Sequence, residues 1–549
     1  MRLYLPSAIA ALIASPVAVI ATAISSGTAP ASLLVKTSKG AVLGTSSEYR
    51  DGVSVFKGIP FAAPPTGSLR WQPPADVTSW SDTYNATVFG AECAQSYSTG
   101  GIFSSGSKNI AEDCLYLNVW RPESATSASN LPVYVWIYGG RFEGGAGSVP
   151  TYDGSGLAIH DVVVVTLNYR MGPFGFLAHP DLSSESGFNS SGNYGLLDQL
   201  FALQWVQDEI AAFGGNPKQV TVGGQSAGSA SALDMMYSPL GSGLIAGVVS
   251  ESGARAPHDP ETAGLATSYR TKAAAESSGV SFLAEMNVST IAELRNVPMD
   301  TLLEADNDFD TILQGAIFEN SSAIQEPPLW RPVIDGYVLL HGYGESLKLD
   351  AHSDVPILTG ANSGEASSNS GASGDYSSEI STIMGNLTDE YLALYPSNND
   401  TQASDSSTAF WLDISRVGLW IWASEWAAGG AKSNVYTYFW THAPPNQTAG
   451  AYHGSELWYV FNNIPYGSGD RVPTTWGSDD LAIETQMSKY WINFIKSGNP
   501  NGGDLTHFPP TTKDSTKIMW LGDQWGADSI ADDLRINFIK KWFSTLKEW

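Results

Sequence analysis

Apolar residues recur along this chain in short continuous runs separated by longer amphipathic segments. The runs are rich in valine, isoleucine and aromatic residues, and they are nearly unbroken, as in strands buried on both faces of a parallel sheet. We therefore predict strands at residues 112–120, 131–140, 162–170, 220–222, 243–252, 355–362 and 434–442. Two shorter alternating runs, at residues 33–43 and 53–56, predict further strands near the start.

Helical periodicity fills several of the intervals between these strands. Leu196, Leu200 and Leu203 lie at helical spacing in a segment that stops at the pair Gly214-Gly215. The predicted helices cover residues 193–213, 229–237 and 481–498, and the last of these is expected to be the terminal helix.

Alternating strands and helices predict an α/β protein with a large, mostly parallel central sheet and helices on both faces. Residues 257–332 are helical and acidic without a clear strand, which predicts an insertion that covers the sheet. Residues 56–74 are too rich in proline and glycine for either regular element. No repeat or linker divides the chain, so we expect one domain over residues 24–549.

The N-terminus has the pattern of a secretory signal peptide. Arg2 precedes an almost unbroken apolar run at residues 3–24, and Ala21-Thr22-Ala23 matches a small-residue cleavage site. A membrane anchor is the alternative, but the alanine-rich composition favours cleavage, and no later apolar run could span a bilayer. We predict a signal peptide at residues 1–23 and a secreted, extracellular protein.

Secretion predicts glycosylation and an oxidised cysteine pair. N-x-S/T acceptors occur at Asn85, Asn189, Asn287, Asn320, Asn386, Asn399 and Asn446. Cys93 and Cys114 are the two cysteines of the chain, and a disulfide between them would stabilise the fold by roughly 3 kcal/mol. A metal site at this pair would need histidine or acidic partners, and none is suitably spaced.

The net charge of −27 argues against nucleic acid and anionic membrane surfaces, because both would be repelled. The 43% hydrophobic content supplies a core for a large globular protein. We expect a soluble monomer.

The segment Gly224-Gln225-Ser226-Ala227-Gly228 has the G-x-S-x-G pattern of a nucleophile elbow. It follows a predicted strand and precedes a predicted helix, which is the context that this motif needs. The two glycines let the flanking backbones approach, and the Ala227 N–H at the helix start can face a developing oxyanion. A chance match is the alternative reading, because the chain contains 55 glycines and many serines.

A serine nucleophile needs a histidine base that is held by a carboxylate, in the chain order Ser, acid, His. Glu365 follows the predicted strand at 355–362. Of the eight histidines in the chain, His453 lies in a later loop. His442 and Asp354 are rivals that also fit the order, although His442 ends a strand, where a structural role is the simpler interpretation.

Several ordered motifs together resemble the type B carboxylesterase/lipase family, which includes carboxylesterases, fungal lipases and cholinesterases. They include FKGIPFAAPPTGSLRW, EDCLYLNV, NYRMGPFGF, VTVGGQSAG, TGANSGEAS and GAYHGSELWYVF, and the resemblance runs from about residue 34 to the C-terminus. It implies an α/β-hydrolase fold without metal or cofactor. It also implies that Ser226 is the nucleophile, Glu365 the acid, His453 the base and Cys93–Cys114 the family's first disulfide.

The expected oxyanion loop departs from the Gly-Gly-Gly-Phe pattern of that family. Here it reads Gly139-Gly140-Arg141-Phe142, so the donors would be the N–H groups of Gly140, Arg141 and Ala227. The Arg141 side chain could narrow the acyl pocket or clamp a polar or carboxylated substrate. Alternatively, it turns outward or pairs with Glu143.

Three further features bear on the catalytic function. Gln225 replaces the usual glutamate before the serine, which predicts weaker stabilisation of protonated His453. Gly364 and Ala366 replace the Asp and Gly that usually flank the acid. The loop between the cysteines has no amphipathic pattern, so we expect a small or absent lid and an esterase that acts on a small soluble carboxylic ester. A lipase or sterol esterase, or a binding protein on the same scaffold, are the alternatives.

Overall fold

The computed structural model describes most of the chain. The described residues are 33–96, 101–264, 267–305, 309–319, 321, 324, 326–349, 352–365, 376–464 and 475–548. The predicted signal peptide and the acceptor Asn320 lie outside them. The other six predicted glycosylation acceptors are exposed.

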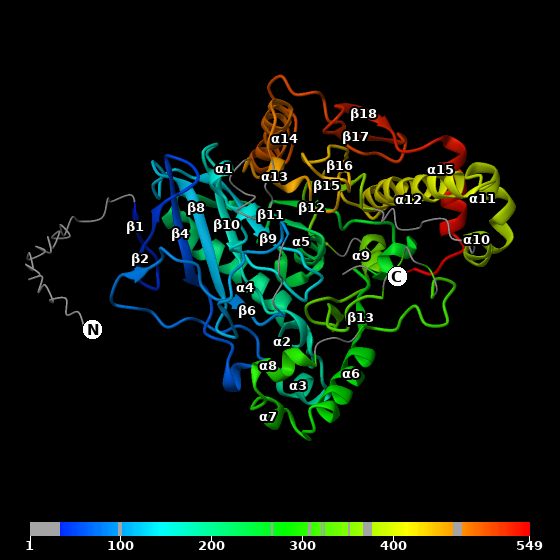
Figure 1. The fold of residues 1–549 in the computed structure, drawn as a ribbon. Coiled ribbons are helices and arrows are strands. Elements are labelled where there is room, and N and C mark those ends of the chain that lie inside the picture. Colours follow the sequence, from blue (N-terminus) through cyan, green and yellow to red (C-terminus); the bar gives the residue numbers. More distant parts are fainter. Residues whose placement is uncertain are drawn as a thin grey trace, which may run out of the picture.

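An eleven-stranded sheet forms the centre of the molecule, in the order β18-β17-β16-β15-β12-β11-β9-β10-β8-β4-β3 (Figure 1). The strands from β10 to β17 in this order are parallel, whereas the pairs β10–β8, β8–β4, β4–β3 and β17–β18 are antiparallel. Their bounds are β3 (Thr45–Ser46), β4 (Val53–Pro60), β8 (Tyr116–Pro122), β9 (Leu131–Ile137), β10 (Val163–Leu167), β11 (Gly215–Gln225), β12 (Gly247–Glu251), β15 (Ile357–Asn362), β16 (Val435–Trp440), β17 (Lys517–Leu521) and β18 (Gly526–Ser529). The predicted α/β fold with a mostly parallel sheet is confirmed.

Helices cover both faces of this sheet. In Figure 1, α4 (Tyr194–Glu209) and α5 (Ala227–Tyr237) lie on one side of β9 and β11, and α14 (Ser478–Ser497) lies on the other. The predicted leucine stripe of α4 is buried, and Gly214 ends the following turn with φ of 90°, a conformation that favours glycine. No helix in the described part of the chain is long and apolar enough to cross a membrane.

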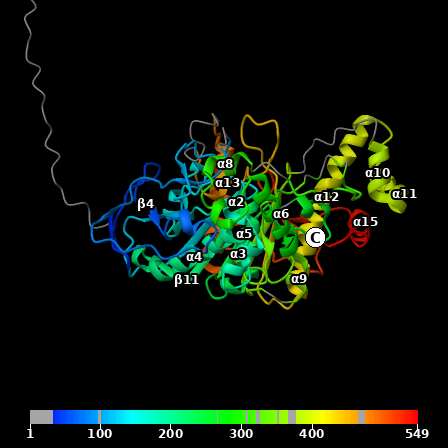
Figure 2. The same ribbon diagram turned by 90° about the horizontal axis from the view of Figure 1, so that it is seen from below.

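Two predictions about the elements need correction, and one long helix was not predicted. β4 continues through Pro60 into the segment expected to be irregular, because β8 supplies its partners across a bulge. α14 is not the terminal helix, since β17, β18 and α15 (Asp533–Phe543) follow it. The 29-residue helix α12 (Asp400–Ala428) was not predicted. Figure 2 shows α12 gathered at one end of the molecule with α10 (Tyr376–Met384), α11 (Thr388–Leu394) and α15.

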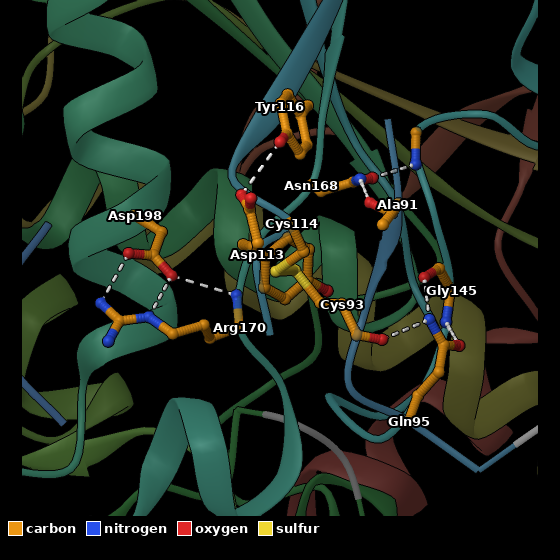
Figure 3. Close-up of a disulfide and its surroundings, with 12 residues drawn as sticks. Ala91, Cys93, Gln95, Asp113, Cys114, Tyr116, Gly145, Asn168, Arg170 and Asp198 are labelled. Atoms are coloured by element: carbon orange, nitrogen blue, oxygen red, sulfur yellow. Dashed lines mark hydrogen bonds and ion pairs between the residues drawn. A yellow bond between two sulfur atoms is a disulfide. The ribbon is translucent and has the colours of Figure 1, made fainter. Parts of the chain in front are cut away.

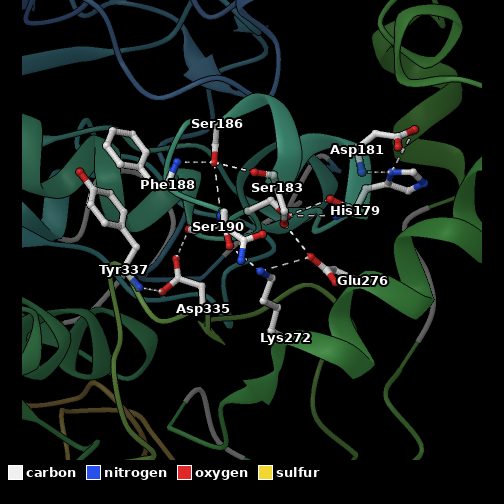
Figure 4. A network of polar contacts seen from close by, with 12 residues as sticks. His179, Asp181, Ser183, Ser186, Phe188, Ser190, Lys272, Glu276, Asp335 and Tyr337 are labelled. Carbon is white, nitrogen blue, oxygen red and sulfur yellow. Dashed lines mark hydrogen bonds and ion pairs between the residues drawn. The ribbon is translucent and has the colours of Figure 1, made fainter.

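The insertion at 257–332 contains α6 (Lys272–Glu285), α7 (Ile291–Leu294) and α8 (Met299–Glu304). It also contains a short strand, β13 (Arg270–Thr271), which pairs with β14 (Val333–Ile334), so the expectation of no strand was wrong. A polar network joins α6 to α3 (Pro180–Glu185), where Ser183 Oγ donates to Glu276 Oε1 at 2.6 Å (Figure 4). The insertion is therefore anchored beside α3.

The predicted disulfide between Cys93 and Cys114 is present. Figure 3 shows that Gln95, close to the bridge, reaches a second loop, with its side-chain amide donating to the Gly145 carbonyl and accepting from the Gly145 N–H, both at 2.8 Å. Gly147, on the same second loop, donates its N–H to the side-chain oxygen of Asn168, which follows β10, at 2.9 Å. The loop that follows β9 is thus held from two sides.

Candidate active site

Ser226 lies in the sharp turn between β11 and α5, as the motif predicts. Its φ of 59° and ψ of −123° are unusual for a residue with a side chain, and such strain is typical of functional turns. The flanking glycines have a steric reason, because a Cβ on Gly224 would lie 2.2 Å from the Gly228 carbonyl oxygen. A Cβ on Gly228 would lie 2.0 Å from the Ile137 carbonyl oxygen of β9. The elbow therefore closes only with glycine at both positions.

Glu365 and His453 come together at the carboxyl ends of the strands. The Nδ1 atom of His453 lies 3.8 Å from Oε1 of Glu365, which is nearly buried. Glu365 Oε1 also accepts hydrogen bonds from the hydroxyl of Ser252 and, at 3.0 Å, from the N–H of Asn362. The carboxylate oxygen that faces Nδ1 is thus the same one that Ser252 and Asn362 hold in place.

The pKa values of this pair are displaced from their ordinary values in opposite directions. Burial raises the pKa of Glu365, but the nearby charge of His453 and the hydrogen bond from Ser252 outweigh it, so this pKa lies below its usual value. Burial lowers the pKa of His453, but the nearby charge of Glu365 and the charge of Glu456 raise it above its usual value. The pair therefore favours an imidazolium next to a carboxylate.

The other ring nitrogen of His453 contacts the residue next to the serine. Nε2 of His453 lies 2.9 Å from the amide nitrogen of Gln225, which is fully buried. With the Nδ1 proton facing Glu365, Nε2 accepts this hydrogen bond. Ser226 Oγ forms no hydrogen bond to another described residue, so Gln225 occupies the nitrogen that the serine hydroxyl would use.

The loop after β9 presents its backbone to the same place. Gly140, Arg141 and Phe142 have φ values of 113°, 57° and 65°. A positive φ is uncommon for residues other than glycine, so the backbone is strained at Arg141 and Phe142. Within the described ranges, the N–H groups of Gly140, Arg141 and Ala227 have no protein acceptor.

A cavity of about 470 Å³ lies over these groups. Its wall includes all six predicted residues, namely Gly140, Arg141, Ser226, Ala227, Glu365 and His453. The insertion contributes Glu261, Gly264, Ile324 and Pro328 to the wall. The insertion therefore helps to enclose this cavity and does not only cover the sheet.

The two rival residues have other partners. His442 is held at both nitrogens, with Nδ1 2.6 Å from Asp523 and Nε2 3.1 Å from Asp480. Asp354 accepts from the backbone N–H groups of Lys432 and Ser433. Both serve local structure.

Two functional contacts were not predicted from the sequence. Ser252, which holds Glu365, follows β12 just as Ser226 follows β11, and its place after a parallel strand could have indicated a site residue. Arg255 lines the cavity and forms ion pairs with Asp259 and Glu261. No group of three or more His, Cys, Asp or Glu side chains among the described residues is placed to hold a metal ion.

The chain is similar to known esterases over most of its length. The chain is 34% identical over 504 residues to fumonisin B1 esterase from Sphingopyxis macrogoltabida, covering 90% of this chain and 87% of that protein. It is 33% identical over 509 residues to para-nitrobenzyl esterase from Bacillus subtilis, covering 89% and 95% of the two chains. The solved structure of a PNB esterase matches with a TM-score of 0.74 at 30% identity, covering 92% of this chain and 99% of that chain.

The match to a family model covers nearly the whole sequence. Residues 31–539 match the carboxylesterase family, and the matched solved structure has the same large, mostly parallel sheet surrounded by helices. The chain therefore belongs to the carboxylesterase family, has the α/β-hydrolase fold and is a carboxylic ester hydrolase.

Proposed function

We propose that this esterase works through a Ser226, His453 and Glu365 triad and an acyl-enzyme intermediate. His453 Nε2 takes the proton of Ser226 as its oxygen attacks the ester carbonyl, and then returns that proton to the leaving alcohol. Glu365 orients the imidazole through Nδ1 and stabilises the imidazolium. Water activated by His453 then attacks the acyl-enzyme, which releases the acid and restores Ser226.

One observation carries this proposal: the cavity wall brings together the strained serine, the paired imidazole and carboxylate, and three N–H groups that have no acceptor among the described residues. Such N–H groups stabilise the negative charge that develops on the carbonyl oxygen. For the proton transfer to occur, Ser226 Oγ must replace the Gln225 amide as the partner of His453 Nε2.

The test is Ser226→Ala with Ser229→Ala as the matched control. Ser229 lies one turn further along α5, is buried, and bonds to Ser250. We expect Ser226→Ala to lose about 10⁴-fold or more in kcat, with Ser229→Ala close to wild type. Mass spectrometry after treatment with an organophosphate should place one adduct on Ser226. Activity that survives in Ser226→Ala would contradict the proposed nucleophile.

We also propose a preference for soluble esters over aggregated lipid. The described residues of the loop between the cysteines, 94–96 and 101–113, include no helix, which supports a small lid. Activity on a short-chain ester should follow ordinary saturation as the substrate concentration passes its solubility limit. A sharp rise at that limit, or a preference for long acyl chains, would indicate a lipase.

We also propose that the protein is secreted and glycosylated. The exposed positions of six acceptors and the presence of the disulfide support an extracellular protein.

A further inference from the structure

The cavity contains an arginine that the proposed triad does not use as a side chain. Arg141 supplies an N–H to the proposed oxyanion hole, and its guanidinium extends toward the insertion, where Nη2 donates to the Glu326 carbonyl at 2.9 Å. Ile324 and Pro328, on either side of that carbonyl in sequence, also line the cavity. The guanidinium is thus tied to one wall of the substrate site.

The other charges on the cavity wall are largely compensated. Arg255 pairs with both Asp259 and Glu261, and Glu365 faces His453. The nearest carboxylate to Arg141 is Glu143, with 3.7 Å between Nε and Oε2, and both side chains are about one-third exposed (36% and 35%). A pair of this length and exposure is weak.

Two further observations indicate that Arg141 retains capacity for an anion. Burial lowers the pKa of Arg141, with the charge of Glu143 opposing that effect only in part, so the surrounding protein does not replace the lost hydration of the cation. Nη1 has no partner among the described residues, and a guanidinium presents paired N–H groups that fit a carboxylate.

The position of Arg141 also indicates which part of the substrate it would bind. His453 must lie next to the leaving alcohol, since it returns the proton to that oxygen, and Phe103 packs beside His453 with ring centroids 6.3 Å apart. The wall at Ile324 and Pro328, on either side of the Glu326 carbonyl that Arg141 binds, is therefore left for the acyl group.

We propose that the substrates of this enzyme include esters whose acyl group carries a second carboxylate, bound by the Arg141 guanidinium. The inference rests on the proposed function of the site. Because the whole protein carries a net charge of −27, the overall field opposes an anionic substrate, and a local cation in the cavity has to provide the attraction.

The test compares two ethyl esters with acyl chains of equal carbon number, monoethyl glutarate and ethyl valerate, by pH-stat. In wild type we expect a higher kcat/KM for monoethyl glutarate. In Arg141→Met, the ratio of the two kcat/KM values should fall by about 10- to 100-fold, the range for a lost charged hydrogen bond. The ratio cancels any general damage to the oxyanion loop, because both esters use the same backbone donors.

Glu143→Gln is the second variant, since it removes the carboxylate that competes for Arg141. It should raise the same ratio by about two- to fivefold. A wild-type preference for ethyl valerate, or a ratio unchanged in Arg141→Met, would overturn the inference while leaving the proposed triad intact. A preference for a carboxylate placed only in the alcohol part would overturn the acyl assignment. Loss of the proposed function itself would appear separately, as hydrolysis of both esters that persists in Ser226→Ala.

Discussion

The contact between Gln225 and His453 makes the pH dependence of this esterase sensitive to one substitution. Gln225→Glu would place a carboxylate where the amide nitrogen now lies 2.9 Å from His453 Nε2. Hydrogen bonding to the neutral imidazole would be replaced by an ion pair with the imidazolium. The pKa of His453, already raised by Glu365, should therefore rise further.

The magnitude follows from the burial of the position. Unit charges about 4 Å apart interact by about 4 kcal/mol at an effective dielectric constant of 20. Gln225 is fully buried, and desolvation of the introduced carboxylate offsets part of this energy. Burial and the charge of Glu456 raise the pKa of Glu251, the partner of Gln225 in the strand register, which favours the neutral form of this neighbour. We expect Gln225→Glu to raise the pKa of His453 by about 1 to 3 pH units.

The assay is the pH profile of kcat/KM on a neutral ester. The base must be neutral to take the serine proton, so a higher pKa moves the acid limb of the profile to higher pH by the same amount. Gln225→Met is the matched control, because it removes the hydrogen bond to neutral His453 without adding charge and should move the limb by less than about 1. If the acid limb of Gln225→Glu coincided with that of Gln225→Met, the assigned contact would be wrong.

The remaining predictions concern the supports of the site and the export of the protein. Gln95→Ala should lower kcat by about 10-fold or more with little change in KM, because Gln95 holds Gly145 in the proposed oxyanion loop; an unchanged kcat would show that the loop does not need this support. Asp198→Ala should destabilise the fold by about 3–5 kcal/mol in urea unfolding, since it leaves the buried Arg170 without its bidentate carboxylate, and a loss below about 1 kcal/mol would contradict this account. N-terminal sequencing of protein secreted from a eukaryotic host should begin near residue 24, and glycosidase treatment should lower its mass; a retained N-terminus would favour the anchor.

Much of the architecture follows from local sequence. The continuous apolar runs predicted β9 and β10, and the shorter apolar run before Gly360 predicted β15, because strands buried on both faces are mainly apolar. β4 was predicted too short, since its second half contains Gly58 and Pro60 and becomes a strand only through pairing with β8. Local composition cannot report a partner that comes from far along the chain.

The helix α12 shows the same limit. It has no strong apolar stripe, and its buried aromatic residues face elements from distant parts of the chain: Phe410 lies against Trp542 of α15 with ring centroids 5.4 Å apart, and Trp420 Nε1 donates to the Thr512 and Ser515 carbonyls. Helices of this kind are stabilised by tertiary packing more than by intrinsic propensity.

The sequence by itself determined the chemical groups of the site and their order along the chain. The elbow at Ser226 depends on glycines that are its near neighbours, and Glu365 and His453 follow from the order of the strands that precede them. Only the tertiary structure decided which groups touch. Ser252 reaches Glu365 across 113 residues and Gln225 reaches His453 across 228, while the Arg141 guanidinium reaches the Glu326 carbonyl across 185. These contacts depend on how the strand ends and loops pack in space, and the spacing of the residues along the chain does not predict that packing.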